Sequence, residues 1–260
     1  MTRVCVLGPS GRMGRAVLDA ALGHDDVRIA AAVDRPEAGG LGTLVAGGVH
    51  ATADLDAGLL ACDVYVDFTA PAATGAVALA AARHRRAAVI GTTGLGPAEE
   101  AAVEQLARVA PIVVAANFSL GVNLVLGLVQ QAARALGPAW DAEVVETHHR
   151  AKRDAPSGTA LMIARAIAAG HGVDYERVKR HTRDGDVGPR PRGEIGVSSV
   201  RGGDVIGEHT AYFFGAAERL EISHRATSRA IFATGALRAA AWVAGQPPGR
   251  YDMLDVLGLQ

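Results

Sequence analysis

The chain has 260 residues, 49% of them hydrophobic, which is enough to bury a core in one large domain or two small ones. The net charge of −1 hides a local basic excess between positions 150 and 201, eleven Lys/Arg against six Asp/Glu, which favours a small anionic ligand over nucleic acid. No apolar run reaches the roughly 20 residues of a membrane span, and no N-terminal signal pattern is present, so we expect a cytoplasmic protein. Cys5 and Cys62 lie in apolar runs and are expected to be buried, reduced thiols.

Residues 2–7 predict a short buried strand, followed by the glycine-rich segment GPSGRMG and a helix. This order is typical of dinucleotide binding, because glycines let the backbone approach a pyrophosphate at the helix N-terminus. The spacing Gly8-x-x-Gly11-x-x-Gly14 differs from the commoner G-x-G-x-x-G and also occurs in ordinary tight turns.

A second strand over residues 27–34 supports the dinucleotide interpretation, since it ends at an acidic residue, Asp34. A carboxylate at this place can accept hydrogen bonds from the adenosine ribose, whereas the next residue, Arg35, can pair with a 2′-phosphate. The pair predicts tolerance of both NADH and NADPH, with a plain turn at the strand end as the alternative.

Three further strands, at residues 62–69, 87–94 and 111–119, alternate with helices at 71–85 and 95–110, which predicts a parallel, doubly wound sheet. Ligands of such sheets bind beyond the carboxyl ends of the strands. Asn117, the polar residue after the last strand, is expected either to bond the nicotinamide half of a cofactor or to cap the next helix. The segments expected to ring the cofactor are residues 8–13, 34–35, 68–69, 91–93 and 115–118.

After residue 118 the pattern changes to a helix (119–137), a strand (141–149), a helix that Gly170 is expected to end, a charged loop (183–196) and short strands up to 226. A last helix, 227–245, is expected to pack on the first domain. We predict an α/β fold with an N-terminal Rossmann-type parallel sheet and a C-terminal α+β domain with an open mixed sheet. The dinucleotide-binding domain is 1–118, completed by about 229–260, and 119–228 is the substrate-binding and oligomerisation domain.

The segment HHRAKRDAPSGTA, residues 148–160, is the strongest candidate site. Ser157 can cap the following helix, and the backbone amides of Gly158 and Thr159 at its positive end can bind an anion. Lys152 adds a cation nearby in sequence. A capped surface helix behind a solvated basic loop is the alternative, which the neighbouring histidines disfavour.

His148 and His149 are adjacent in a strand, so they point to opposite faces and are not expected to share a metal ion. One of them can face a pocket as a proton donor, and Glu146, on the same face as His148, can support its imidazole. The sequence has no G-x-S-x-G elbow and no Walker loop, which disfavours hydrolases and kinases.

The segments GPSGRMGR, DFT, GTTG, AANFSLGVN, ETHHRAKRDAPSGTA, RGGDVIGEHT and ERLEISHRATSR together resemble the dihydrodipicolinate reductases, also named 4-hydroxy-tetrahydrodipicolinate reductases. The resemblance follows the same order over nearly the whole chain. It implies an oxidoreductase that uses NADH or NADPH to reduce a cyclic imine dicarboxylate to tetrahydrodipicolinate, on the diaminopimelate route to lysine. It also implies a homotetramer, with neither nucleic acid nor a membrane as partner.

The resemblance implies a role for individual residues. His148 and Lys152 match the catalytic proton donors, and His149, Gly158 and Thr159 match the substrate contacts. Where some relatives carry Glu-Arg, this chain has the shorter Asp34 before Arg35, which leaves the NADH or NADPH preference open. The matching cofactor residues are Gly8, Pro9, Ser10, Gly11, Arg12, Met13, Asp34, Arg35, Gly91, Thr92, Thr93, Ala115, Ala116, Asn117 and Phe118.

Two alternatives share the scaffold: a reductase of another imine, and a nicotinamide-nucleotide-sensing binding protein without catalysis. The presence of both His148 and Lys152 argues against the sensor, and the complete segment 148–160 argues against another substrate only through the resemblance.

Overall fold

The structure is a computed structural model that describes residues 1–259. The chain divides into two compact units, one formed by Met1–Leu120 with the chain from Ala230 onward and the other by Gly121–Arg229. Among the described residues, no helix combines the length and the hydropathy needed to cross a bilayer.

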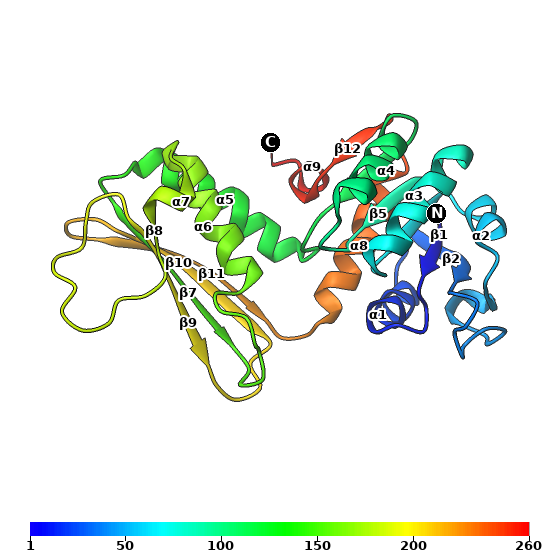
Figure 1. Cartoon of the computed structure of the whole chain (residues 1–260), viewed down its shortest axis with the longest axis horizontal. Coiled ribbons are helices and arrows are strands. Elements are labelled where there is room, and N and C mark those ends of the chain that lie inside the picture. Colours follow the sequence, from blue (N-terminus) through cyan, green and yellow to red (C-terminus); the bar gives the residue numbers. More distant parts are fainter. Residues whose placement is uncertain (260) are drawn as a thin grey trace. The chain divides into compact units, whose positions relative to one another are not determined.

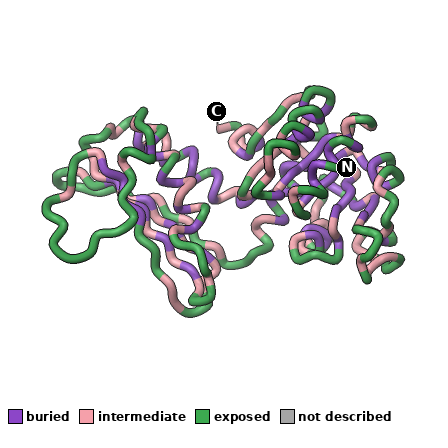
Figure 2. Tube along the Cα trace, in the orientation of Figure 1, coloured by how far each residue is buried: buried purple, intermediate pink, exposed green. Residues whose placement is uncertain are grey.

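The first unit contains a parallel sheet with the strand order β12-β6-β5-β4-β1-β2-β3 (Figure 1). Its central strands form because Val, Ile and Ala follow one another without interruption, as expected for strands that are buried on both faces. Figure 2 shows buried residues gathered along these strands. The strands are β1 (Thr2–Leu7), β2 (Val27–Val33), β3 (Ala51–Thr52), β4 (Val64–Asp67), β5 (Ala87–Ile90), β6 (Pro111–Val114) and β12 (Gly249–Tyr251).

Helices cover both faces of this sheet. One core cluster joins the sheet to α1 (Arg12–Ala21), α8 (Ala230–Val243) and α9 (Met253–Leu257). The other joins it to α2 (Leu55–Ala61), α3 (Pro71–His84) and α4 (Pro97–Ala107). The predicted Rossmann-type sheet is confirmed, although the short strands β3 and β12 and the helix α2 have no counterpart among the predicted elements.

The second unit contains a mixed sheet with the strand order β11-β10-β7-β9-β8. This sheet confirms the prediction of a mixed sheet in the C-terminal domain. Strand β7 pairs antiparallel with β10 and parallel with β9. Alternate residues of β7 are buried, and the helices α5 and α6 lie along that face. The elements are α5 (Leu120–Leu136), β7 (Asp141–His148), α6 (Gly158–His171), α7 (Tyr175–Val178), β8 (Lys179–Arg180), β9 (Ile195–Arg201), β10 (Gly207–Phe214) and β11 (Arg219–Ala226).

The prediction that Gly170 ends the helix after residue 158 is wrong. Helix α6 continues to His171 and is capped by Gly172, which has a φ of +69°. Gly170 lies against α5, where an added Cβ would stand 2.5 Å from the carbonyl oxygen of Gln130. This glycine therefore permits close helix packing, which sequence alone does not distinguish from a cap.

The charged loop before β9 is fixed to the sheet by ion pairs. Arg183 Nη2 lies 2.8 Å from Glu143 Oε1, and Arg190 Nη1 lies 2.6 Å from Asp141 Oδ1. Arg183 also binds Glu194. Part of the local basic excess is therefore neutralised within the fold and is not available to a ligand.

Candidate active site

The glycine-rich turn between β1 and α1 is tightly folded against the start of the helix. Gly8 has a φ of +64°, and the amide of Gly11 donates to the carbonyl oxygen of Gly8 over 2.9 Å. A Cβ on Gly14 would lie 2.1 Å from that oxygen, so the first turn of α1 packs directly on the loop. The N-terminus of α1 begins at Arg12, immediately after this turn.

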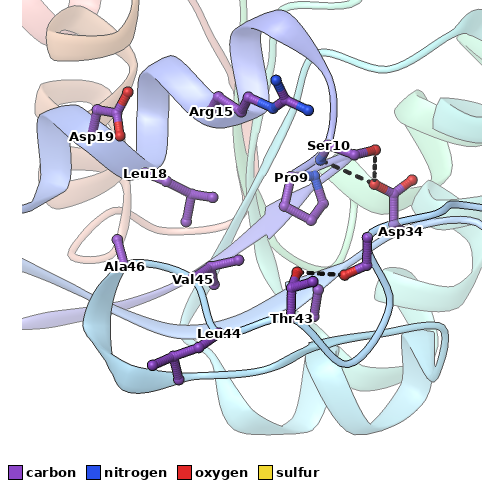
Figure 3. Close-up of a pocket in the computed structure, with 12 residues that line it drawn as sticks. Pro9, Ser10, Arg15, Leu18, Asp19, Asp34, Thr43, Leu44, Val45 and Ala46 are labelled. Atoms are coloured by element: carbon purple, nitrogen blue, oxygen red, sulfur yellow. Dashed lines mark hydrogen bonds between the residues drawn. The ribbon is translucent and has the colours of Figure 1, made fainter.

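Asp34, at the end of β2, is hydrogen-bonded to this turn. Its Oδ2 accepts from the Ser10 amide over 3.1 Å and from the Ser10 hydroxyl (Figure 3). Its Oδ1 accepts from the Arg35 amide over 2.9 Å. Burial acts to raise the pKa of Asp34, but the bonds from Ser10 outweigh it and bring the pKa below its ordinary value. The carboxylate is therefore ionised and held beside the glycine turn.

A pocket of about 470 Å³ opens between this turn and the segment after β2. Figure 3 shows Ser10 and Asp34 on one side and Leu44, Val45 and Ala46 on the other. The lining also includes Arg15, a cation one helical turn beyond Gly11, which sequence reasoning missed although the spacing Gly11–Arg15 could have indicated it. Residues 40–46 were missed because they have no regular pattern.

Behind the strand tips, the carboxylate of Asp67 at the end of β4 is fully buried and accepts hydrogen bonds from three threonines. Its Oδ1 accepts from the Thr69 amide over 2.8 Å and the Thr92 hydroxyl over 3.3 Å, while its Oδ2 accepts from the Thr74 hydroxyl over 2.7 Å. The carboxylate thus ties together the turns after β4 and β5. Its signal in the sequence is an acid that ends an apolar strand and is followed by threonines.

The remaining predicted cofactor segments lie at the same strand ends, in different environments. A Cβ on Gly91 would lie 2.0 Å from the Phe68 ring, which packs edge-on against Phe118 at a centroid distance of 5.4 Å. The Phe118 side chain is buried in the core, so any cofactor contact of this residue uses its backbone. Asn117 Oδ1 accepts from the Ser119 amide over 2.8 Å, in the turn before α5 begins at Leu120. Thr93 and Ala116 are exposed.

At the end of β7, His148 and Glu146 face the same side, as predicted. His148 Nδ1 lies 2.5 Å from Glu146 Oε2, and Glu146 is fully buried. Arg201 binds both carboxylate oxygens, at 2.8 and 2.7 Å, and the Ser157 amide donates to Oε1 over 3.1 Å. Burial acts to raise the pKa of Glu146, but Arg201 and the other donors lower it to about 2.

An ionised carboxylate only accepts hydrogen bonds, so Nδ1 of His148 carries a proton and Nε2 is the nitrogen available for proton exchange. Arg201, from β9, was not recognised in the sequence as part of this arrangement. Its register opposite His148 on the parallel strand becomes visible only once the strands are paired.

His209, on β10, is a second histidine of this cluster that sequence reasoning missed. Its Nε2 lies 3.0 Å from the Ser157 hydroxyl, and its ring lies edge-on to His148 at a centroid distance of 5.2 Å. Burial, followed by Coulombic effects that include those of His148 and Lys152, lowers the pKa of His209 to about 4. His209 is therefore neutral at physiological pH.

The loop between β7 and α6 carries the other candidates. Lys152 Nζ lies 3.0 Å from Asp154 Oδ1, and the His149 amide donates to the Val205 carbonyl over 2.7 Å. Ser157 caps α6 as predicted, by accepting from the Ala160 amide over 3.1 Å. Gly158 is exposed and Thr159 partly exposed at the N-terminus of the helix.

The two groups of candidates lie in different units, the dinucleotide candidates in the first and the proton donors and anion site in the second. Within residues 1–259, no three His, Cys, Asp or Glu side chains are grouped so that they could hold a metal ion.

Comparison with known proteins identifies both halves of the chain. Residues 2–118 match the family model described as dihydrodipicolinate reductase, N-terminus, and residues 121–257 match dihydrodipicolinate reductase, C-terminus. The 4-hydroxy-tetrahydrodipicolinate reductase of Alkalilimnicola ehrlichii is 49% identical over 99% of both chains, and that of Cereibacter sphaeroides is 49% identical over 98% of both chains.

The fold is also similar to a solved structure, dipicolinate-bound dihydrodipicolinate reductase from Paenisporosarcina sp. TG-14. The TM-score is 0.81 at 24% identity, with 98% of each chain covered.

Proposed function

The chain belongs to the dihydrodipicolinate reductase family, and from this premise we propose how its residues carry out the reaction. It is an NAD(P)H-dependent enzyme that reduces 4-hydroxy-tetrahydrodipicolinate to tetrahydrodipicolinate, on the diaminopimelate route to lysine. The observation that carries the proposed division of roles is the contact between His148 Nδ1 and the buried, ionised Glu146.

The residues of the first unit fit a dinucleotide. The Gly8–Gly11 turn leads into the N-terminus of α1, whose positive end favours a phosphate, and the pocket beside it has room for a nucleoside. We assign residues 8–13 to the pyrophosphate, Asp34 to the adenosine ribose, and residues 91–93 and 115–118 to the nicotinamide half. When bound, the reduced nicotinamide supplies the hydride.

We propose that both NADH and NADPH are accepted. The ionised Asp34 suits ribose hydroxyls and repels a 2′-phosphate, whereas Arg35 is exposed beside it and Arg15 lines the same pocket. The two cations offset the repulsion, because charge-assisted hydrogen bonds to phosphate are among the strong ones. The ratio of kcat/KM for the two cofactors measures this balance.

The second unit binds the dicarboxylate and supplies the proton. The amides of Gly158 and Thr159 at the start of α6, with His149 and Lys152, hold the substrate carboxylates. Loss of water from the 4-hydroxy substrate gives a conjugated imine, and a hydride added to this imine leaves a negative charge that one proton must neutralise. His148 gives it from Nε2 when its ring is protonated on both nitrogens, with Lys152 as the second donor, while Glu146 accepts from Nδ1, stabilises the charged ring and fixes its orientation.

The test follows the absorbance of the reduced nicotinamide while a synthase generates the imine from pyruvate and aspartate semialdehyde. Loss of absorbance should require both proteins and occur with either cofactor. His148→Gln should lower kcat at least about tenfold with an unchanged Kd for NADH, and Lys152→Ala should also raise the KM for the imine. If neither variant changes kcat, the assignment of the proton donors is wrong.

We further propose a cytoplasmic homotetramer that assembles through the second unit. The face of its sheet opposite α5 and α6 carries Val145, Tyr212 and Phe214, and the rings of Tyr212 and Phe214 stack at a centroid distance of 5.7 Å. Exposed aromatic rings on a sheet face suit burial against another copy, and they share this face with polar side chains such as Glu143 and Glu221. Light scattering on the eluted protein should give four times the chain mass, and Tyr212→Glu should reduce it.

A further inference from the structure

Arg201 lies at the end of β9, between two acidic residues. Its Nη1 and Nη2 bind the two oxygens of the Glu146 carboxylate, at 2.8 and 2.7 Å. Nη2 also donates to the backbone carbonyl of Asp154 over 2.7 Å. One planar guanidinium thus joins β9 to β7 and to the loop that precedes α6.

Each of these two partners binds one of the proposed proton donors. Glu146 Oε2 lies 2.5 Å from His148 Nδ1, and Asp154 Oδ1 lies 3.0 Å from Lys152 Nζ. Arg201 is therefore connected to His148 through Glu146 and to Lys152 through Asp154. In the structure it binds neither donor itself.

We propose that Arg201 is a positioning residue for the reaction, which fixes both proton donors through Glu146 and Asp154. The inference rests on the proposed function of His148 and Lys152. A bidentate arginine fixes the plane of a carboxylate as well as its charge, so Glu146 can hold the His148 ring in one orientation. The contact with the Asp154 carbonyl holds the loop on which Lys152 is placed.

Among the groups around Glu146, Arg201 is the principal cation that pairs with its carboxylate. His209 on β10 is neutral at physiological pH, and the amide of Ser157 is a neutral donor to the same carboxylate. Lys152 is paired with Asp154. Without Arg201, a fully buried carboxylate would lose its bidentate partner and reorient or take up a proton, and the His148 ring would follow it.

The experiment compares Arg201→Met, which keeps much of the side-chain volume, with Arg201→Lys, which keeps the charge but not the planar fork. Arg177→Met is the matched control, because Arg177 lies in the same unit in an exposed ion pair with Asp174, away from both proton donors. For each protein, kcat, the KM for the enzymatically generated imine, the Kd for NADH and the thermal midpoint are measured. The ring ¹⁵N shifts of His148, assigned by their absence in His148→Gln, report its tautomer.

Arg201→Met should lower kcat at least tenfold, raise KM several-fold, leave the Kd for NADH within twofold and move the His148 ¹⁵N shifts away from an Nδ1–H tautomer. Arg201→Lys should recover part of kcat and less of KM, and Arg177→Met should match the wild type. If the thermal midpoint falls while kcat, KM and the ¹⁵N shifts do not change, Arg201 is only structural and the inference is overturned.

Two further outcomes are decisive. If Arg201→Met does not fold, Arg201→Lys decides alone, and wild-type KM and ¹⁵N shifts in that variant overturn the inference. If the ¹⁵N shifts move as expected but kcat does not, Arg201 does position His148, and it is the proposed role of His148 as proton donor that fails.

Discussion

Thr74, in the first turn of α3, donates its hydroxyl hydrogen to the buried carboxylate of Asp67 over 2.7 Å. The same carboxylate accepts from Thr69 and Thr92, which belong to the turns after β4 and β5. A fully buried carboxyl group held by threonine donors depends on each of them, because each missing bond leaves part of its desolvation uncompensated. The shape of two turns of the proposed cofactor site therefore depends on hydrogen bonds behind them.

Thr74→Val should accordingly weaken dinucleotide binding although Thr74 is fully buried. We expect an increase of about tenfold in the Kd for NADH and a loss of about 1–3 kcal/mol in the free energy of unfolding. Fluorescence titration and denaturant unfolding measure the two effects. Thr52→Val is the control, because the Thr52 hydroxyl accepts only from the nearby Asp54 amide. Equal behaviour of the two variants would contradict the prediction.

Gly14→Ala should disturb the glycine turn from inside the helix. The added Cβ would meet the Gly8 carbonyl oxygen at 2.1 Å, so either α1 or the turn must move, at a cost of about 1–3 kcal/mol. The Kd for NADH should rise at least tenfold while the dicarboxylate site in the other unit is unaffected. Gly23→Ala, a glycine with nothing within 4 Å of the added atom, should bind NADH as the wild type does. Calorimetric titration with NADH compares the two.

Comparing NADPH with NADH shows how much Arg15 and Arg35, the cations beside Asp34, contribute to binding the 2′-phosphate. Arg15→Ala and Arg35→Ala should each lower kcat/KM for NADPH by about tenfold, the size of one charge-assisted contact, and change that for NADH less than threefold. Steady-state assays with both cofactors measure the ratio. A loss that is equal for NADH and NADPH would show that neither arginine faces the 2′-phosphate.

The sequence predicted the sheet of the first unit because its strand signal is local. Apolar runs such as residues 64–67 and 87–90 end in glycine or polar residues, and their alternation with helices leaves few topologies. Strand β12 was not predicted, because its three residues pair with β6, which lies more than a hundred positions earlier in the sequence. Short edge strands are defined by their partners and not by their composition.

In the candidate site, too, the residues with a local signal could be predicted and those brought in by strand pairing could not. His148, Lys152 and Ser157 lie within ten residues and could be recognised together, and the parity of β7 correctly placed Glu146 beside His148. Arg201 and His209 come from other strands, and only the register of β9 and β10 against β7 brings them to Glu146. Residues that reach a site only through strand pairing cannot be recognised from the sequence around them.

His209 predicts how the stability of the protein depends on pH. In the unfolded chain this histidine binds a proton below about 6.5, whereas in the folded chain its pKa is lowered to about 4, first by burial. Stability is therefore complete above pH 6.5 and is lost as the pH falls toward 4, by roughly 3 kcal/mol from this group. The lowered pKa of Glu146 also reduces stability as the pH falls, but it acts between about pH 4.5 and pH 2, so the two pH ranges are separate.

Denaturant unfolding at pH 7, 6, 5 and 4 should show the loss of stability in the wild type and a smaller loss in His209→Gln. The pH-independent cost of the substitution is first subtracted at pH 7. An equal slope in both proteins between pH 6.5 and 4 would assign the loss to other groups.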